Sequence, residues 1–255
     1  MTKPKVVLLL GSAPDAVDCI GWDKALFDAI VTINNAWQIR EDWDYVVFPD
    51  DFAKNRRPQS LSGGQAMIEA DAFVPANNAY GGIVYAGATM AFTAAYWTLH
   101  ALKPTVLAFL GCDMVYPQKG RAEASHFYGT GTPDPLRDDI TLRSLPAKSA
   151  RLMLYAARQE CACVRLSNGP SQLVFPSANR ENLAHVQGRG PFAGDALFDA
   201  AAALETKLGY FVPSGQYWRE AAAFSATKID AVDRAWLRAA GLDSMAPLHQ
   251  LEPAS

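Results

Sequence analysis

Short runs of consecutive apolar residues constrain the fold of this chain more than any other feature. They do not alternate with polar residues, as the strands of a half-exposed sheet would, and each is followed by small polar residues. A strand that is apolar on both sides is buried on both faces, which is typical of a parallel sheet covered by helices. We therefore predict an α/β, Rossmann-like fold, with a mainly parallel sheet and helices on both faces. The predicted strands are Val6–Leu10, Ala29–Ile33, Tyr45–Phe48, Ala72–Val74, Val106–Leu110 and Cys163–Leu166.

Two helices between these runs and two after them complete the predicted architecture. The first pair covers about residues 88–102 and 146–160, the second with Ser144 near its start. The second pair begins near Leu197 and Ile229, with a Thr227-x-x-Asp230 capping box opening the last helix. We predict an α/β domain over residues 1–175 and a helical C-terminal extension over residues 176–255 that packs on it. Core packing is the role expected for Tyr217 and Trp218 in that extension, and the alternative role is a contact with an acceptor substrate.

The loops that follow the predicted strands are rich in Gly, Asn, Asp, Pro and Ser, whereas the loops at the opposite ends are ordinary connectors. Such residues are common in turns, so any one loop is explained by turn formation alone. All six loops share the pattern, which favours a binding crevice, because ligands of open α/β sheets lie outside the carboxyl ends of the strands. These loops are Gly11–Asp15, Asn34-Asn35, Pro49–Asp51, Pro75–Asn78, Gly111–Asp113 and Ser167–Ser171.

The motifs of several common enzyme classes are absent from the chain. It has no GxxxxGK[ST] sequence, no GxGxxG after the first strand and no GxSxG, which excludes the ordinary P-loop, dinucleotide-binding and α/β-hydrolase patterns. Backbone N–H groups of Gly11–Pro14 are expected to face an anion, and Gly87 and Thr89 form a second candidate anion site before a helix. The asparagines suit a ligand with carbonyl, amide and hydroxyl groups, because an amide both donates and accepts.

Residues 116–145 form a long segment without a clear element. Its aromatic and basic residues would suit a lid that closes over a phosphate-containing ligand. The alternative is a solvated loop, in which acidic residues compensate the basic ones. The residues that favour a lid are Tyr116, Lys119, Arg121, His126, Tyr128, Arg137 and Arg143.

The order of these motifs over residues 5–175 resembles one protein group. It comprises bacterial sialyltransferases that use CMP-sialic acid and the related 6-hydroxymethylpterin diphosphokinase-like (MptE-like) proteins. The resemblance implies a Rossmann-like sheet with a nucleotide across its carboxyl edge. The motifs that carry it are Leu10–Pro14, Ile33–Asn35, Gly87–Thr89, Gly111–Asp113, His126–Gly129 and Ser167–Asn168.

The resemblance also implies roles for single residues. The phosphate-side loop corresponds to Gly11, Ser12 and Pro14, the loop before the buried helix to Thr89, and the Gly-x-Asp turn to Gly111 and Asp113. The lid tyrosines that hold phosphate correspond to Tyr116 and Tyr128, the asparagine after the second strand to Asn34, and the base-side loop to Asn168. Ser12 stands where the sialyltransferases carry Asn. No histidine follows Tyr128 in the lid, where theirs is catalytic.

We therefore predict a nucleotide-dependent transferase, and a glycosyltransferase is the preferred kind. His126 is the predicted base, and Asp113 is a second catalytic candidate. Asn35, Asp50 and Gly87 join the predicted nucleotide-binding residues. One alternative is an ATP-dependent pterin-type diphosphokinase with Mg²⁺ held by Asp113 and Asp50 or Asp51. Another is a nucleotide-binding protein without activity. No tightly bound cofactor is expected.

The composition limits the partners further. Half of the residues are hydrophobic and the net charge is −3, which indicates a folded chain and argues against nucleic acid as a partner. Residues 72–102 carry no charge, but their Gly, Pro and Asn residues argue against a membrane span. Four scattered cysteines and an N-terminal apolar run of five residues favour a cytoplasmic protein. The predicted partners are a nucleotide or nucleotide-sugar donor and a small-molecule or glycan acceptor, and a homo-oligomer is left open.

Overall fold

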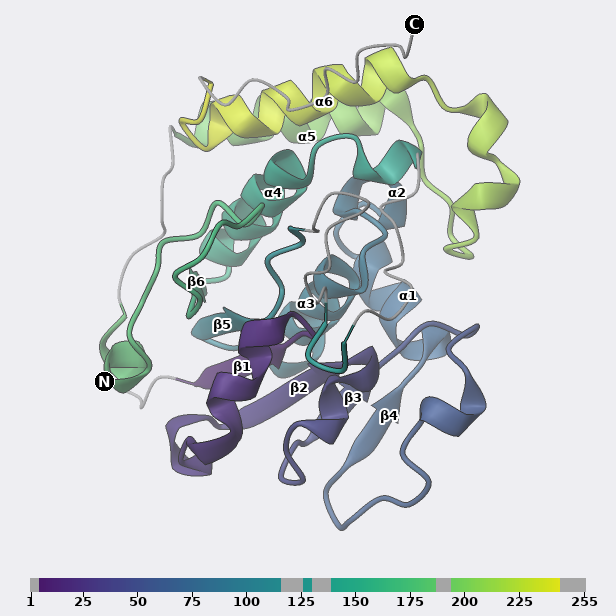
Figure 1. The fold of residues 1–255 in the computed structure, drawn as a ribbon. Coiled ribbons are helices and arrows are strands. Elements are labelled where there is room, and N and C mark those ends of the chain that lie inside the picture. The colour runs from purple at the N-terminus through teal and green to yellow at the C-terminus, as the bar shows by residue number, and fades with distance from the viewer. Residues whose placement is uncertain (1–4, 116–125, 130–138, 187–193, 244–255) are drawn as a thin grey trace, which may run out of the picture.

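A six-stranded, all-parallel sheet forms the centre of the protein. The computed structural model describes residues 5–115, 126–129, 139–186 and 194–243. The strand order is β4-β3-β2-β1-β5-β6, so that the first strand of the chain lies in the middle of the sheet (Figure 1). The predicted α/β, Rossmann-like fold is confirmed. The strands are β1 (Val6–Leu10), β2 (Ala29–Ile33), β3 (Tyr45–Val47), β4 (Ala66–Ile68), β5 (Val106–Leu110) and β6 (Ala162–Arg165).

One predicted strand is wrong. The run Ala72–Val74 lies inside helix α1 (Ala70–Asn78), and its Pro75 is also helical rather than part of a loop. Three consecutive apolar residues satisfy a helical period as readily as a strand. The fourth strand is instead Ala66–Ile68, a half-buried strand of three residues at the edge of the sheet. Its length and partial exposure leave too little apolar signal for detection.

All six α-helices of the described chain bury their apolar side chains in one core, on one face of the sheet. The other face packs against 3-10 helices, including η1 (Pro14–Gly21), η3 (Asn34–Gln38) and η6 (Arg180–His185). Helical residues thus cover both faces as predicted, but only one face has α-helices (Figure 1). Besides α1, the α-helices are α2 (Ile83–Ala86), α3 (Met90–Leu102), α4 (Leu145–Arg158), α5 (Asp195–Leu208) and α6 (Ala226–Ala239).

The uncharged stretch from residue 72 to residue 102 is divided among α1, α2 and α3. Glycines with positive φ, Gly82 and Gly87, flank α2 on either side. Within the described residues, none of the helices has both the length and the apolar character to cross a bilayer.

The strand order creates a switch point at the carboxyl ends of β1 and β5. From β1 the chain passes through η1 to β2 on one face of the sheet, and it reaches β5 through α3 on the other. The loops after β1 and β5 therefore diverge to opposite faces and leave a crevice between them. Gly11 and Gly111 meet there so closely that a Cβ on Gly11 would lie 2.2 Å from the Gly111 carbonyl oxygen. Only glycine fits at position 11.

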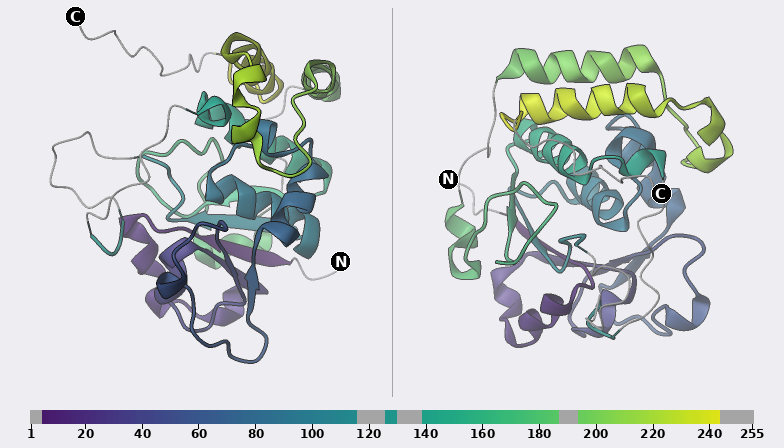
Figure 2. Two further views of the ribbon diagram at one scale, coloured as in Figure 1. Left: turned by 90° about the vertical axis from the view of Figure 1, so that its right-hand side faces the viewer. Right: turned by 45° about the horizontal axis from the view of Figure 1, so that its top comes forward.

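Helices α5 and α6 run side by side as an outer layer over α4 (Figure 2). The predicted capping box of α6 is wrong, because the helix begins at Ala226 and Asp230 pairs with Arg143 instead. This contact is one of several ion pairs that join α4, and Arg143 two residues before it, to the outer layer. We call these pairs the ion-pair seam: Arg143–Asp230, Lys148–Asp233, Arg151–Glu205 and Arg158–Asp199.

The centre of the seam is buried and its two ends are partly exposed. Arg151 is 0% exposed, and its guanidinium donates from Nε and Nη2 to the two oxygens of Glu205 at 2.7 and 2.8 Å. The Tyr96 hydroxyl and the Tyr80 carbonyl oxygen accept the other hydrogen bonds of Arg151, and the Trp236 indole donates to Glu205. A buried charge needs such complete pairing, because desolvation would otherwise cost several kcal/mol.

Candidate functional site

A cavity of about 750 Å³ opens at the switch point between β1 and β5. Its wall includes the loops after β1, β2, β3 and β5, the first turn of α3, and the segment Ser214–Trp218 of the C-terminal extension. This volume lies within the range of about 300–1,000 Å³ that is usual for small-ligand sites. The cavity is therefore where the topology of the sheet predicts a ligand.

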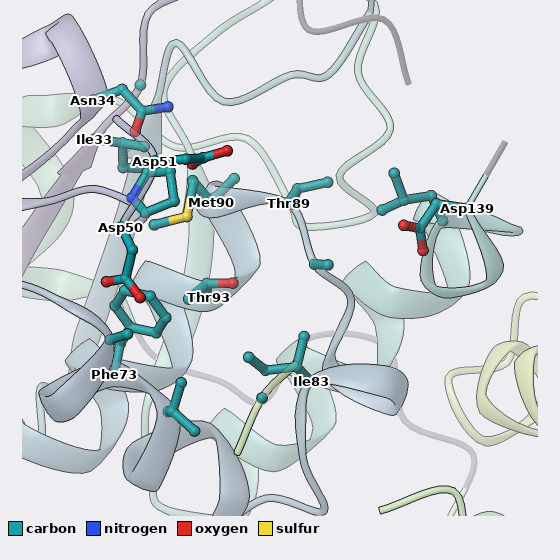
Figure 3. Close-up of a pocket in the computed structure, with 18 of the residues that line it drawn as sticks. Ile33, Asn34, Asp50, Asp51, Phe73, Ile83, Thr89, Met90, Thr93 and Asp139 are labelled. Atoms are coloured by element: carbon teal, nitrogen blue, oxygen red, sulfur yellow. The ribbon is translucent and has the colours of Figure 1, made fainter. Parts of the chain in front are cut away.

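At one side of the cavity, the ends of β2 and β3 place three polar residues together, Asn34, Asp50 and Asp51 (Figure 3). The backbone of Asn34 has a positive φ of 52°, a conformation that asparagine adopts more easily than most residues. Its side-chain oxygen is buried and has no hydrogen-bond partner among the described residues. We call this group the strand-edge end, and it offers acceptors to a ligand that donates hydrogen bonds.

The loop after β1 contributes Gly11, Ser12 and Ala13 to the wall. The predicted cradle of free N–H groups is wrong in part. The Gly11 N–H donates to the Leu110 carbonyl oxygen at 2.8 Å, and the Ala13 N–H donates to the Gly111 carbonyl oxygen at 3.0 Å. These bonds join the ends of β1 and β5, so the loop holds the switch point together instead of presenting a row of donors.

The N-terminus of α3 reaches the wall between the two sides of the cavity (Figure 3). Thr89 caps this helix, with its hydroxyl accepting from the Phe92 N–H at 3.3 Å, and Met90 and Ala91 also line the cavity. The first turn of a helix carries unpaired N–H groups and a partial positive charge of about half a unit. Gly87 does not line the cavity. It packs against Lys148 instead, which would lie 3.2 Å from an added Cβ.

At the opposite side lies Asp139, which Figure 3 shows apart from Asn34 and Asp51. The Tyr217 hydroxyl donates to Asp139 at 2.7 Å, and the other oxygen of Asp139 accepts from the backbone and hydroxyl of Thr141. Tyr217 and Trp218 line the cavity, and Trp218 is 62% exposed. Core packing was the wrong expectation for Trp218. We call Asp139 with Gln216, Tyr217 and Trp218 the extension end.

His126 also lines the cavity and is half-buried. Its ring stacks on Tyr128 with the centroids 4.9 Å apart, and the Phe127 N–H next to it donates to the Ser12 carbonyl oxygen at 3.0 Å. Burial lowers the pKa of His126 below its usual 6.5. The imidazole is therefore neutral at pH 7, which is the protonation state that a general base requires.

The structure brings most of the predicted site residues to the cavity wall. Two of the others, Asp113 and Asn35, are buried elsewhere, and Tyr128 and Asn168 are exposed outside it. Pro14 begins η1 and does not line the cavity. Tyr116, Lys119, Arg121 and Arg137 lie outside the described residues, as does most of the predicted lid. The predicted site residues that line the cavity are Gly11, Ser12, Asn34, Asp50, Asp51, Thr89, Gly111 and His126.

Asp113 is 9% exposed and accepts a hydrogen bond from the Ser167 hydroxyl at 2.8 Å. Burial, and then the negative charge of Asp113, raise the pKa of the Asp15 carboxyl. The predicted ligands of Mg²⁺, Asp113 with Asp50 and Asp51, do not form one group. Across the described ranges, no three His, Cys, Asp or Glu side chains gather in a way that would hold a metal ion.

The charged residues of the described wall are all acidic, since His126 is neutral at pH 7. They comprise four aspartates, and no Lys or Arg of the described chain lines the cavity. Arg143, a predicted phosphate ligand, pairs with Asp230 in the seam instead. The wall thus favours a ligand rich in hydroxyl or amino groups, with an anionic group only where α3 begins. The four carboxylates belong to Asp50, Asp51, Asp71 and Asp139.

Sequence reasoning considered Tyr217 and Trp218 mainly as core residues, and it missed Asp139, Gln216 and the apolar wall formed by α1. No periodic pattern distinguishes Asp139 from other loop carboxylates. The sequence did contain one indication of a turn at the cavity wall, because Gly215 lies between two polar residues. In the structure Gly215 has a positive φ of 73°. Phe73 and Val74 were assigned to a strand and not to the wall of a cavity.

Comparison with known proteins adds no relative to this picture: this chain matches no family model, no curated protein and no solved structure.

Proposed function

We propose that this chain is a transferase that moves a sugar from a nucleotide-activated donor to an acceptor hydroxyl group. The observation that carries the proposal is one cavity with two separate polar ends at the switch point of a parallel sheet. A reaction between two bound substrates requires such an arrangement, because holding both together replaces a bimolecular encounter.

The strand-edge end suits the ribose and base of the donor. Asn34, Asp50 and Asp51 supply acceptors for ribose hydroxyls and for the amino group of a base. The N-terminus of α3 suits the phosphate, since helix N-termini bind anions through their N–H groups and dipole. Because the described wall is otherwise acidic, it favours a donor with one phosphate over one with two.

In the proposed reaction the acceptor oxygen attacks the sugar carbon that bears the phosphate. The bond from that carbon to the phosphate oxygen breaks, and the nucleoside monophosphate leaves with the electron pair. His126, neutral at pH 7, takes the proton of the acceptor hydroxyl, and the partial positive charge of α3 stabilises the leaving phosphate. Among the described residues, Asp113 does not gather with Asp50 and Asp51 into the carboxylate set that a Mg²⁺-dependent diphosphokinase would use, which favours the sugar transfer over that alternative.

A thermal-shift series tests the proposal on the full chain. CMP, UMP, GMP and AMP, and the matching diphosphates, are added with and without Mg²⁺. Ligand binding raises Tm, because a ligand at 100 times its Kd stabilises the folded protein by about 2.7 kcal/mol. We expect at least one monophosphate to raise Tm more than its diphosphate, since the described wall is acidic. Larger shifts by the diphosphates that depend on Mg²⁺ would instead support the diphosphokinase. Nucleotide binding without transfer to any acceptor would support the non-catalytic alternative.

The variant Ser12→Phe places an uncharged ring in the cavity beside Gly11 and Ala13. We expect it to abolish the nucleotide-induced shift by filling the site. Ser60→Phe is the matched control, because Ser60 is exposed and does not line the cavity. A shift that persists unchanged in Ser12→Phe would remove the loop after β1 from the nucleotide site.

A further inference from the structure

The segment Ser214–Trp218 forms a built wall of the cavity and not a loose surface loop. Gly215 packs against α1 and α2, where an added Cβ would lie 2.8 Å from Val74 and 3.2 Å from Ile83. Just before the segment, the Pro213 carbonyl oxygen accepts from the Asn78 side chain at 2.8 Å. The hydrogen bond from the Tyr217 hydroxyl to Asp139 is the third contact that holds the backbone of this segment in place.

This anchoring holds a large apolar ring in solvent. Trp218 is 62% exposed, whereas the other five tryptophans are buried or half-buried. Its ring meets that of Tyr217 edge to face, with the centroids 5.6 Å apart. Leaving an indole in water forgoes the stabilisation of burial, and fixing the neighbouring backbone adds an entropic cost. An exposed indole that lines a cavity offers a ligand a large apolar surface together with an N–H donor.

The neighbours of Trp218 define the chemistry of that ligand. The Asp139 carboxylate accepts hydrogen bonds, the Tyr217 hydroxyl donates and accepts, and Gln216 contributes an amide to the same wall. A flat apolar surface beside acceptors and donors matches a pyranose ring, which has a C–H face and a rim of hydroxyls. Among the described residues that line the extension end, none is Lys or Arg, which disfavours an acidic ligand there.

We infer that the extension end is a binding subsite for a neutral sugar, and that in the proposed transfer it holds the acceptor glycan. The inference builds on the proposed function only in calling this sugar the acceptor. Trp218 supplies the stacking surface, and Asp139 and Tyr217 hold the hydroxyls. The C-terminal extension then sets acceptor specificity, while the strand loops bind the donor.

Saccharide binding to the full chain without nucleotide tests the subsite. Lactose, N-acetyllactosamine, maltose and chitobiose serve as probes, and tryptophan fluorescence is the readout. We expect a saturable change with at least one of them, and at least a tenfold loss of affinity in Trp218→Ala, measured by calorimetry. Tyr217→Phe should weaken the same saccharide about threefold to tenfold, as for one lost hydrogen bond.

Phe211→Ala is the matched control, because Phe211 is an exposed aromatic residue of the same extension that does not line the cavity. It should bind saccharide as the unaltered chain does. No binding of any probe, or unchanged affinity in Trp218→Ala, overturns the subsite. The nucleotide thermal shift is measured on the same proteins. If saccharide binding depends on Trp218 but no nucleotide binds, the proposed function fails and the sugar subsite stands.

Discussion

The ion-pair seam and the cavity both place charged groups against the interior of the protein, but they differ in how these groups are satisfied. At the centre of the seam, Arg151 and Glu205 use their hydrogen-bonding groups on each other and on neighbouring side chains. In the cavity, the buried oxygen of Asn34 has no partner among the described residues, and several carboxylates line one space. The polar groups at the seam centre are thus used within the fold, whereas the Asn34 oxygen at the strand-edge end is available to a ligand.

The largest expected effect comes from removing one partner at the seam centre. Glu205→Ala leaves the buried Arg151 charge without its carboxylate, which costs about 3–5 kcal/mol of unfolding free energy. Urea denaturation measures this loss. Asp243→Ala is the control, because Asp243 and its partner Arg238 are both exposed and such pairs contribute about 0–1 kcal/mol. Equal losses in the two variants would contradict the distinction between a buried and an exposed pair.

A change in the cavity should affect the reaction and spare stability. His126→Ala is expected to lower turnover about 10²-fold while leaving nucleotide affinity and unfolding free energy nearly unchanged, because the base acts on the acceptor proton. The pH profile gives a second readout. Since burial lowers the pKa of His126, activity should rise with pH, and the midpoint of the rise should lie below pH 6.5. Loss of nucleotide affinity together with turnover would make His126 a donor-binding residue.

The smallest effect is expected at a second pair of the seam, which sharpens the comparison. Lys148 donates to one oxygen of Asp233 at 2.9 Å, but the other oxygen is buried without a partner among the described residues. The double variant Lys148→Met, Asp233→Leu should therefore be as stable as the unaltered chain or more stable by about 1 kcal/mol. The single variant Asp233→Leu is the control and should lose stability, since it leaves Lys148 unpaired.

The pH dependence of this pair has a defined sign. Burial raises the pKa of Asp233 above 3.8, so its contribution to stability is present below pH 3.8 and is lost as pH rises through the folded value. The advantage of the double variant should accordingly be larger at pH 7 than at pH 4. An advantage that is the same at both values would mean that Asp233 does not titrate in this way.

The sequence predicts those parts of the fold whose signal is local. β1, β2 and β5 are continuous apolar runs, and the bounds predicted for them agree with the structure. Asn34 and Asp50 were found because strand ends in a parallel sheet share one edge. β4 was missed, since three half-buried residues carry no periodic signal, and α1 was mistaken for a strand.

Contacts between distant parts of the chain left no local signal. Tyr217 and Asp139 are 78 positions apart, and neither residue is distinctive where it stands. Arg151 and Lys148 resemble solvent-facing helix residues, and only their partners, 54 and 85 positions later, explain why they are buried. The extension end of the cavity depends on the same long-range packing, which a local pattern does not encode.

The spacing of the seam has a consequence for synthesis of the chain on the ribosome. Helix α4 is made before Glu205 and Asp233, and at about 5–20 residues per second the 54 positions between Arg151 and Glu205 take several seconds to translate. During that interval the nascent α/β layer holds cations whose carboxylates do not yet exist. Pairing of Arg151 and Lys148 therefore waits for the last helices, and the cavity wall at Ser214–Trp218, which lies between α5 and α6 in the sequence, is made in the same late interval.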